Sequence, residues 1–185
     1  LDQIVRPGKP AYPIRVGYIG SLTRHKGVHV LIDAFRRIPP EQATLDVYGS
    51  PDPFPEYSAG LRQLAEGHEH IRLRGAFEHG RLRQVLQELD LLVVPSLWYE
   101  NSPVVIQEAF RSGVPVVASR LGALPEKVKE GVHGLLFEPG DVESLARVLS
   151  GVLSDPGQLV ALRQNLRGYR NSFEEHLGRL SSLYE

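Results

Sequence analysis

Short apolar runs alternate along this chain with longer segments in which apolar residues recur at helical spacing. The strand-like runs lie at 14–19, 44–48, 71–74, 91–94, 114–118 and 134–137. The helical spacing predicts helices at 27–38, 57–66, 81–89, 102–113, 125–130, 142–153, 158–169 and 172–184. Six short strands alternating with helices predict an α/β fold built on a doubly wound, Rossmann-like parallel sheet with helices on both faces.

Two of the runs differ in their expected environment. In the run at 71–74, Arg72 and Arg74 alternate with apolar residues, which is typical of an exposed edge strand. The run at 91–94 is apolar throughout, as in a parallel strand that is covered on both faces. We therefore expect the first run at a margin of the sheet and the second near its middle.

The chain reads as one domain. Its 185 residues are enough for a single hydrophobic core, and no internal repeat or low-complexity segment divides it. We predict a single domain over 1–185, in which 1–13 form a leading segment. The chain contains no methionine, so we expect it to be a piece of a longer protein.

Composition excludes several classes of function. The 21 basic and 22 acidic residues nearly balance, which gives no net attraction for nucleic acid, and we expect no nucleic-acid partner. The absence of cysteine excludes disulfides, thiolate zinc sites and cysteine nucleophiles. No apolar run approaches the roughly 20 residues that a membrane-spanning helix needs.

The loop after the first run, at 20–26, carries Arg24 and Lys26 just before a predicted helix. Helix N-termini and cations both favour an anion, and phosphate is the natural guest. The loop lacks the glycine and lysine spacing of a Walker A motif and the G-x-G-x-x-G fingerprint of dinucleotide-binding proteins. A solvated turn that carries two cations is the equally weighted alternative.

Two glutamates follow the fourth run. Glu100 lies in the loop before a predicted helix, and Glu108 lies within that helix, with seven residues between them. A carboxylate near a helix N-terminus is favoured electrostatically whether or not it has a function. Two carboxylates could also be the acid and nucleophile of a glycosidase, but their spacing in sequence does not give their separation in space.

A histidine pair and an aromatic pair are weaker candidates for a functional site, because each also has an ordinary structural explanation. His68 and His70 lack a third clear ligand, so a polar loop is a better interpretation than a metal site. Trp98 and Tyr99 could stack on a base or a sugar ring, although aromatic residues at strand ends are usually packed.

Three stretches, in this order, resemble one family. They read GSLTRHKGVHVLIDAF from Gly20, YENSPVVIQEAFRSGVPVVAS from Tyr99 and LGALPEKVKEGVHGLLFEPGD from Leu121. The chain resembles the C-terminal half of glycosyltransferase family 4 enzymes, which have the two-domain GT-B architecture. The resemblance extends from about Ile14 to Tyr184, and its strongest signature is the pair of glutamates followed by Gly-Val-Pro-Val-Val.

The resemblance implies a donor-binding domain for a UDP- or GDP-sugar and gives roles to single residues. Glu100 matches the catalytic glutamate, which contacts hydroxyl groups of the transferred sugar, and Glu108 matches the glutamate that binds the ribose. Lys26 matches the lysine on the diphosphate. The backbone N–H groups of Val104 and Val105 match helix N-terminal groups that also hold phosphate.

The sequence departs from the family pattern at a few of these positions. Ser21 stands where the family commonly has an arginine on the diphosphate, and Arg24 is the candidate to supply that charge. Asn101 and Ser102, followed by Pro103, stand where the family often has a glycine-rich turn. We keep Ser21, Arg24, Asn101 and Ser102 among the candidate donor-binding residues.

The resemblance also implies a reaction and partners. Family members retain the anomeric configuration and use no catalytic metal, so we expect neither a metal nor another cofactor, with the nucleotide sugar as a substrate. We expect a glycan or lipid-linked acceptor, held by an N-terminal domain that this chain lacks, in polysaccharide biosynthesis. The predicted location is cytoplasmic, at most peripheral to the inner face of the membrane.

The C-terminal helix has a part in these expectations. Residues 170–185 carry an apolar stripe of Phe173, Leu177, Leu180 and Leu183, which we expect to pack on the absent domain. The chain alone should bind nucleotide without transferring sugar. The alternatives are a non-catalytic nucleotide-binding module and a nucleotide-sugar epimerase of GT-B-like fold. A dinucleotide oxidoreductase is disfavoured because this chain lacks the glycine fingerprint of such enzymes.

Overall fold

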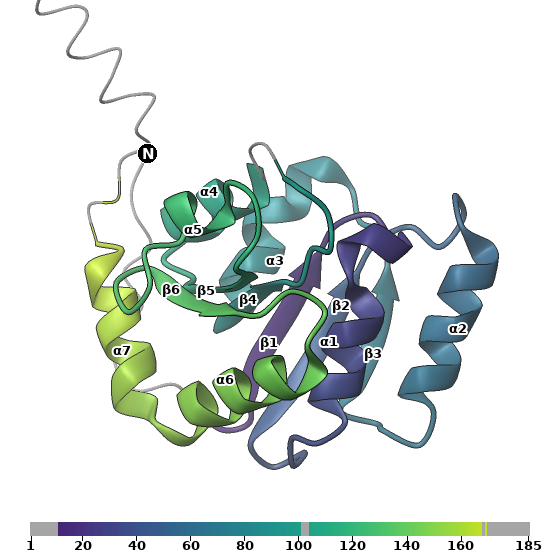
Figure 1. The fold of residues 1–185 in the computed structure, drawn as a ribbon, viewed down its shortest axis with the longest axis horizontal. Coiled ribbons are helices and arrows are strands. Elements are labelled where there is room, and N and C mark those ends of the chain that lie inside the picture. Colours follow the sequence, from purple (N-terminus) through teal and green to yellow (C-terminus); the bar gives the residue numbers. More distant parts are fainter. Residues whose placement is uncertain (1–10, 101–103, 168, 170–185) are drawn as a thin grey trace, which may run out of the picture.

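The computed structural model describes residues 11–100, 104–167 and 169, and within them the chain forms one six-stranded sheet (Figure 1). The strands are β1 (Ile14–Ile19), β2 (Ala43–Tyr48), β3 (Ile71–Gly75), β4 (Leu91–Val94), β5 (Val116–Ser119) and β6 (Gly134–Phe137). Their order is β3-β2-β1-β4-β5-β6, and every neighbouring pair is parallel. This is the predicted doubly wound, Rossmann-like arrangement.

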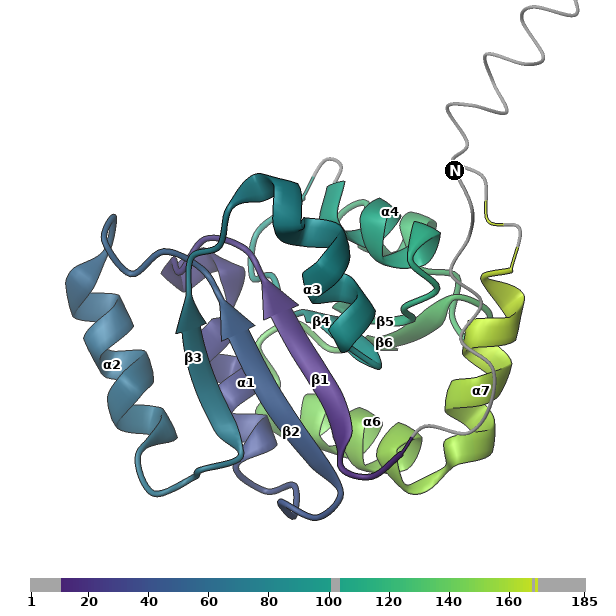
Figure 2. The same ribbon diagram turned by 180° about the vertical axis from the view of Figure 1, so that it is seen from behind.

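Helices cover both faces of the sheet. They are α1 (Val28–Phe35), α2 (Pro55–Ala65), α3 (Leu82–Glu88), α4 (Val104–Arg111), α5 (Leu124–Lys127), α6 (Val142–Ser154) and α7 (Pro156–Asn165). Figure 1 shows α1, α2 and α6 on one face, and Figure 2 shows α3 and α4 on the other. Two short 3₁₀ helices, η1 (Arg24–Lys26) and η2 (His79–Arg81), precede α1 and α3. Among the described residues, no helix is long and apolar enough to cross a membrane.

Each face of the sheet has its own hydrophobic core. On one face, Val16 and Val93 pack with Leu31 of α1 and Leu149 of α6, all fully buried. On the other face, residues of β4 and β5 pack with Phe110 of α4 and with parts of α3 and α5. Strand residues therefore alternate between two apolar environments, which explains why the inner strands are continuous apolar runs.

The edge strand β3 is where the alternation of basic residues predicts it. Figure 2 shows no helix over β2 and β3 on the side where α3 lies. Arg72 and Arg74 form ion pairs with Asp46 of β2, at N–O distances of 2.9 and 2.7 Å. The basic residues of β3 therefore meet a carboxylate on the uncovered part of the sheet.

Element boundaries differ from the predicted ones mainly at glycine and proline. Gly27 is not the first residue of α1, because it adopts a left-handed φ of 71° and links η1 to the helix. The helix predicted at 158–169 begins at Pro156, after Asp155 caps it, and ends at Asn165. The leading residues 1–10 and the C-terminal segment 170–185, with its apolar stripe, lie outside the described residues.

Candidate functional site

The switch in strand order places two loops side by side. Strand β1 pairs with β2 on one side and with β4 on the other. The loops that leave β1 and β4 are therefore neighbours, and they lead to helices on opposite faces of the sheet. Ligands of doubly wound sheets bind at the carboxyl ends of strands at such a point. The loops concerned are those at 20–27 and 95–100, and they contain Lys26 and Glu100.

Local contacts hold the first loop. The hydroxyl group of Tyr18, a buried residue near the end of β1, donates a 2.8 Å hydrogen bond to the backbone carbonyl of Ser21. The backbone N–H of Gly20 donates to the carbonyl of Tyr48 at the end of β2. The chain then turns through η1, so Lys26 projects from the last position of this short helix.

The second loop is attached directly to the first. The backbone N–H of Leu97 donates a 2.7 Å hydrogen bond to the carbonyl of His25. Close packing lies beside this bond, because a Cβ atom on Gly27 would lie 1.8 Å from the carbonyl oxygen of Pro95. Only a glycine fits there, and it fixes the distance between the two loops.

An ion pair joins the loops at the predicted site. Lys26 Nζ lies 2.5 Å from Glu100 Oε1, and the two residues are 74 positions apart in sequence. The hydroxyl group of Ser96 donates a 2.9 Å hydrogen bond to the same carboxylate oxygen. The Glu100 side chain is 16% exposed, so the pair is partly withdrawn from water and still accessible to a ligand.

The loops after β5 and β6 complete this edge. Gly122 has a φ of 56°, and a Cβ atom built on it would lie 3.3 Å from Tyr99 Cα and 3.5 Å from the backbone nitrogen of Glu100. Gly140 lies against the side chain of Leu97 in the same way, at 3.5 Å. Three loops, those after β1, β5 and β6, therefore converge on the segment 97–100.

Helix α4 begins shortly after Glu100 and carries three predicted residues. Val104 is exposed, and Val105 packs partly on the core beneath. Their N–H groups belong to the first turn of the helix, where no intrahelical acceptor exists. Glu108 is half-buried and forms an ion pair with Arg111 at 3.2 Å. The described residues give no direct contact between Glu108 and the Lys26–Glu100 pair.

The remaining predicted residues divide into two groups. Ser21 and Arg24 are exposed on the first loop. Asn101 and Ser102 lie outside the described residues. The aromatic residues beside the site are not packed, since Trp98 is 65% and Tyr99 68% exposed, in contrast to the usual burial of aromatic residues at strand ends.

Buried polar groups next to the first loop have shifted pKa values. Burial raises the pKa of the Tyr18 hydroxyl, and the nearby Tyr57 and Glu100 raise it further. Burial also lowers the pKa of His29 at the start of α1, and the charge of Arg24 adds to that effect. Arg24 therefore places its positive charge near the N-terminus of α1, where an anion would benefit from both.

Histidines and acidic residues do not gather into a metal centre within the described ranges. No group of three or more His, Asp or Glu side chains there is arranged to hold a metal ion. His68 instead accepts a hydrogen bond from Arg36 Nε at 3.1 Å, and the ring of His70 packs near Phe35. Both histidines of the segment before β3 thus contact neighbouring side chains.

Comparison with known proteins identifies the family. The sequence model described as glycosyl transferases group 1 matches residues 13–155. The chain belongs to this family. It is 31% identical over 170 residues to alpha-maltose-1-phosphate synthase of Mycolicibacterium smegmatis, covering 86% of this chain and 43% of that protein. It is 32% identical to D-inositol 3-phosphate glycosyltransferase of Corynebacterium urealyticum, covering 91% of this chain and 42% of that protein.

A solved structure has the same fold. The crystal structure of Anabaena Alr3699/HepE in complex with UDP-glucose superimposes with a TM-score of 0.77 at 28% sequence identity, over 84% of this chain and 43% of that one. This group 1 glycosyl transferase domain therefore spans less than half the length of the relatives that it matches. The structural neighbours have the GT-B architecture that the family resemblance implies.

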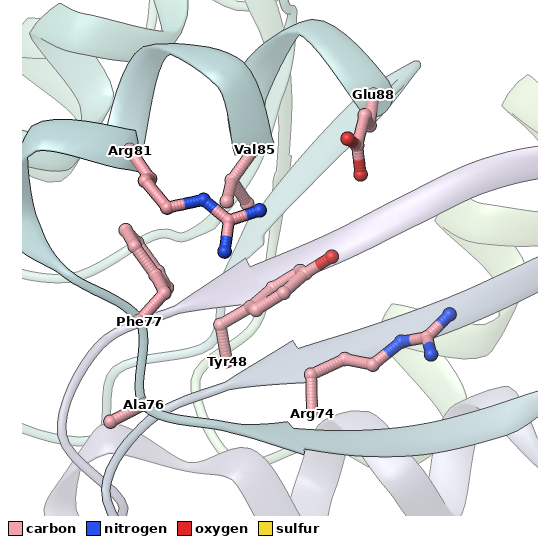
Figure 3. A pocket seen from close by; sticks show the side chains of 7 residues that line it. All are labelled: Tyr48, Arg74, Ala76, Phe77, Arg81, Val85 and Glu88. Atoms are coloured by element: carbon pink, nitrogen blue, oxygen red, sulfur yellow. The ribbon is translucent and has the colours of Figure 1, made fainter.

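A separate cavity of about 320 Å³ lies between α3 and the uncovered ends of β2 and β3 (Figure 3). It is lined by Tyr48, Arg74, Ala76, Phe77, Arg81, Val85 and Glu88. Figure 3 shows Arg81 pointing from the helical side toward the ring of Tyr48, whereas Glu88 lies on the side of the Tyr48 hydroxyl group. None of the predicted site residues lines this cavity, so it is distinct from the Lys26–Glu100 pair.

Sequence reasoning missed two residues of the site. Ser96 follows a proline at the end of β4, and Tyr18 stands in a strand, so neither has a distinctive local pattern. The available signal for Ser96 is its spacing of four residues from Glu100 within a single loop. For Tyr18 it is a polar tip on an otherwise apolar strand, since a buried hydroxyl needs a partner.

Proposed function

We propose that this chain is the donor-binding domain of a retaining glycosyltransferase of family 4. The whole enzyme would transfer a hexosyl group from a UDP- or GDP-sugar to a glycan or lipid-linked acceptor. The observation that carries the proposal is the Lys26–Glu100 pair at the point where the strand order switches. Support comes from the family match and from the Alr3699/HepE structure, whose complex contains UDP-glucose.

The first part of the proposed site holds the diphosphate. Lys26 and Arg24 supply positive charge, and the first N–H groups of α4, at Val104 and Val105, add hydrogen-bond donors for the same anion. Ser21 supplies a polar group on the loop itself. When the bond between sugar and phosphate breaks, negative charge grows on the diphosphate, and donors placed there in advance stabilise that charge.

The second part holds the sugars. Glu108 binds the ribose hydroxyl groups, since a carboxylate accepts two hydrogen bonds at once. Glu100 accepts hydrogen bonds from the transferred sugar and orients it while the anomeric carbon becomes oxocarbenium-like. Asn101 and Ser102 follow Glu100 in the chain and complete the donor-binding set. The reaction requires no resident metal or other cofactor in this scheme.

The remainder of the proposal concerns the whole protein. A second domain would hold the acceptor and close the cleft, since the chain spans less than half of its relatives. The chain alone then binds nucleotide and transfers nothing, as a non-catalytic nucleotide-binding module would. The family resemblance further supports a cytoplasmic location, at most peripheral to the inner face of the membrane, and a role in polysaccharide biosynthesis.

Calorimetry on the chain itself tests the proposal. We expect UDP or GDP to bind. Lys26→Ala should lower the affinity for that nucleotide by about 10- to 150-fold, because a hydrogen bond to a charged group contributes about 1.5–3 kcal/mol. The affinity for the matching nucleoside, uridine or guanosine, should fall less than about twofold, because the nucleoside carries no phosphate. Lys129→Ala, an exposed lysine after α5, is the matched control and should change neither affinity.

Two results would contradict the proposal. Binding of neither UDP nor GDP to the wild-type chain would exclude a donor-binding domain. An equal loss for nucleotide and nucleoside in Lys26→Ala would mean that the lysine maintains the loop rather than binding phosphate.

A further inference from the structure

Both donors that hold Glu100 reach the same oxygen atom. Lys26 Nζ and Ser96 Oγ lie 2.5 and 2.9 Å from Oε1. Within the described residues, no hydrogen bond reaches Oε2. One side of the carboxylate is therefore anchored, and the other side is available to a ligand.

The two donors differ in how firmly they are fixed. Ser96 is 1% exposed and lies two residues after β4. It stands between Pro95, which packs against Gly27, and Leu97, whose N–H donates a hydrogen bond to the carbonyl of His25. Lys26 carries its ammonium group on a flexible side chain that is 28% exposed. A diphosphate bound between the loops would compete with Glu100 for the lysine, and it carries more charge than one carboxylate. Ser96 has no such competing role.

We propose that Ser96 is a positioning residue for Glu100, an inference that rests on the proposed function. It keeps Oε1 anchored while Lys26 exchanges the carboxylate for the diphosphate of the donor. Oε2 then stays directed at the transferred sugar. Without Ser96, the arrival of the diphosphate would leave Glu100 free to rotate away from the sugar.

The test compares nucleotide with sugar nucleotide on the chain. Calorimetry with UDP and UDP-glucose, or with GDP and GDP-mannose if the wild type prefers guanine, gives the ratio of the two dissociation constants. In Ser96→Ala we expect the sugar nucleotide to bind about 5- to 10-fold more weakly relative to the nucleotide diphosphate than in the wild type, because a hydrogen bond to a charged group is lost. Binding of the nucleotide diphosphate itself should change less than about twofold.

Ser119→Ala is the matched control. Ser119 is also fully buried, at the end of the neighbouring strand β5, and among the described residues its hydroxyl group has no hydrogen-bond partner. This variant should leave the ratio at its wild-type value. Thermal unfolding of both variants separates a loss of stability from a loss of positioning, since a structural role alone would lower the melting temperature without changing the ratio.

A double-mutant cycle with Glu100→Ala identifies the route of the effect. In that background, Ser96→Ala should not change the ratio further, because the residue through which it acts is absent. An unchanged ratio in the single Ser96→Ala variant, or a full effect in the Glu100→Ala background, would overturn the inference. The proposed function would still stand if the wild type bound nucleotide and Lys26→Ala abolished the phosphate contribution; absence of any nucleotide binding would overturn both.

Discussion

Glu100 and Glu108 are similar in sequence and different in setting. Glu100 is held by a lysine from another loop and by a buried serine. Glu108 lies on the surface of α4, and its ion pair with Arg111 is of the i,i+3 kind that helix surfaces carry routinely. The first carboxylate is thus fixed by tertiary structure, and the second can leave its partner at little cost to accept a ligand.

This difference predicts distinct binding defects. Glu108→Ala should weaken UDP and UDP-glucose alike, by about 5- to 150-fold, since both carry the ribose. In Glu100→Gln, the affinity for UDP should stay within about twofold of the wild-type value or rise slightly, because Lys26 loses the carboxylate that competes with phosphate. The same substitution should weaken the binding of UDP-glucose relative to UDP. Calorimetry with both ligands measures the two effects, and Glu126→Ala, at an exposed position of α5, serves as the control.

Equal losses of UDP affinity in the two glutamate variants would contradict the division of roles. The same measurement with GDP and GDP-mannose applies if the wild-type chain prefers guanine.

At the scale of elements, the junction between η1 and α1 is the tightest point of the site. Gly27 combines a left-handed φ of 71° with the close approach to Pro95. An alanine there would be strained in its backbone and would also push the second loop away from the first. Since Lys26 precedes this glycine directly, the position of the ammonium group depends on it.

We expect Gly27→Ala to lower the free energy of unfolding by about 2–4 kcal/mol, from backbone strain of order 1–3 kcal/mol and a steric clash. Gly67→Ala is the matched control, because Gly67 has a φ of 77° and, in the part of the chain that the structure describes, no atom lies within 4 Å of the added Cβ. Denaturant unfolding of both variants separates the clash from the strain. Equal losses of stability would show that the contact with Pro95 is unimportant.

The elements could be predicted from the sequence, because apolar spacing reports directly which residues face a core. The six strands and the edge position of β3 follow from that spacing alone. The spacing predicts Gly27 as the first residue of a helix, and this is wrong because periodicity cannot distinguish a left-handed link from the first helical turn. The bond from Ser96 to Glu100 has no periodic signal, because both residues lie in a loop.

Contacts across the whole molecule are the least visible in sequence. Lys26 and Glu100 are 74 positions apart, and only resemblance to a family placed both at one site. A second long-range set lies at the amino ends of the strands, where buried Asp90 pairs with Arg15 at 3.1 Å and with Arg163 of α7 at 2.6 Å. These bonds join the first strand, the entry to β4 and the last described helix.

The Asp90 cluster predicts a pH-dependent stability. Burial opposes the charged form of Asp90, but hydrogen bonds from Arg15 and the charges of Arg15 and Arg163 outweigh it and lower the pKa. A carboxyl group whose pKa is lowered in the native state stabilises the fold at pH values above its pKa in the unfolded chain, which is about 3.9. This contribution is lost as the pH falls through the native pKa. Asp90→Asn should therefore cost about 3–5 kcal/mol at pH 7, because it leaves the arginine charge buried without its counterion.

Denaturant unfolding at pH 7 and at acid pH checks this prediction. The difference between wild type and Asp90→Asn should shrink as the pH falls below about 4. Asp33→Asn, which breaks a surface ion pair between α1 and its C-cap residue Arg36, is the control and should cost less than about 0.5 kcal/mol. A gap between wild type and Asp90→Asn that stays constant with pH would contradict the assigned role of the carboxylate charge.

Trp98 lies two positions before Glu100 with most of its ring in solvent, and it is the only tryptophan in the chain. Indole emission depends on the polarity around the ring and on groups that quench it. The protein therefore contains a single optical reporter, located at the rim of its candidate site and free of background from any other indole. Arrival of a ligand beside Glu100 or a shift of the 97–100 segment would each be observable in the native chain without a label.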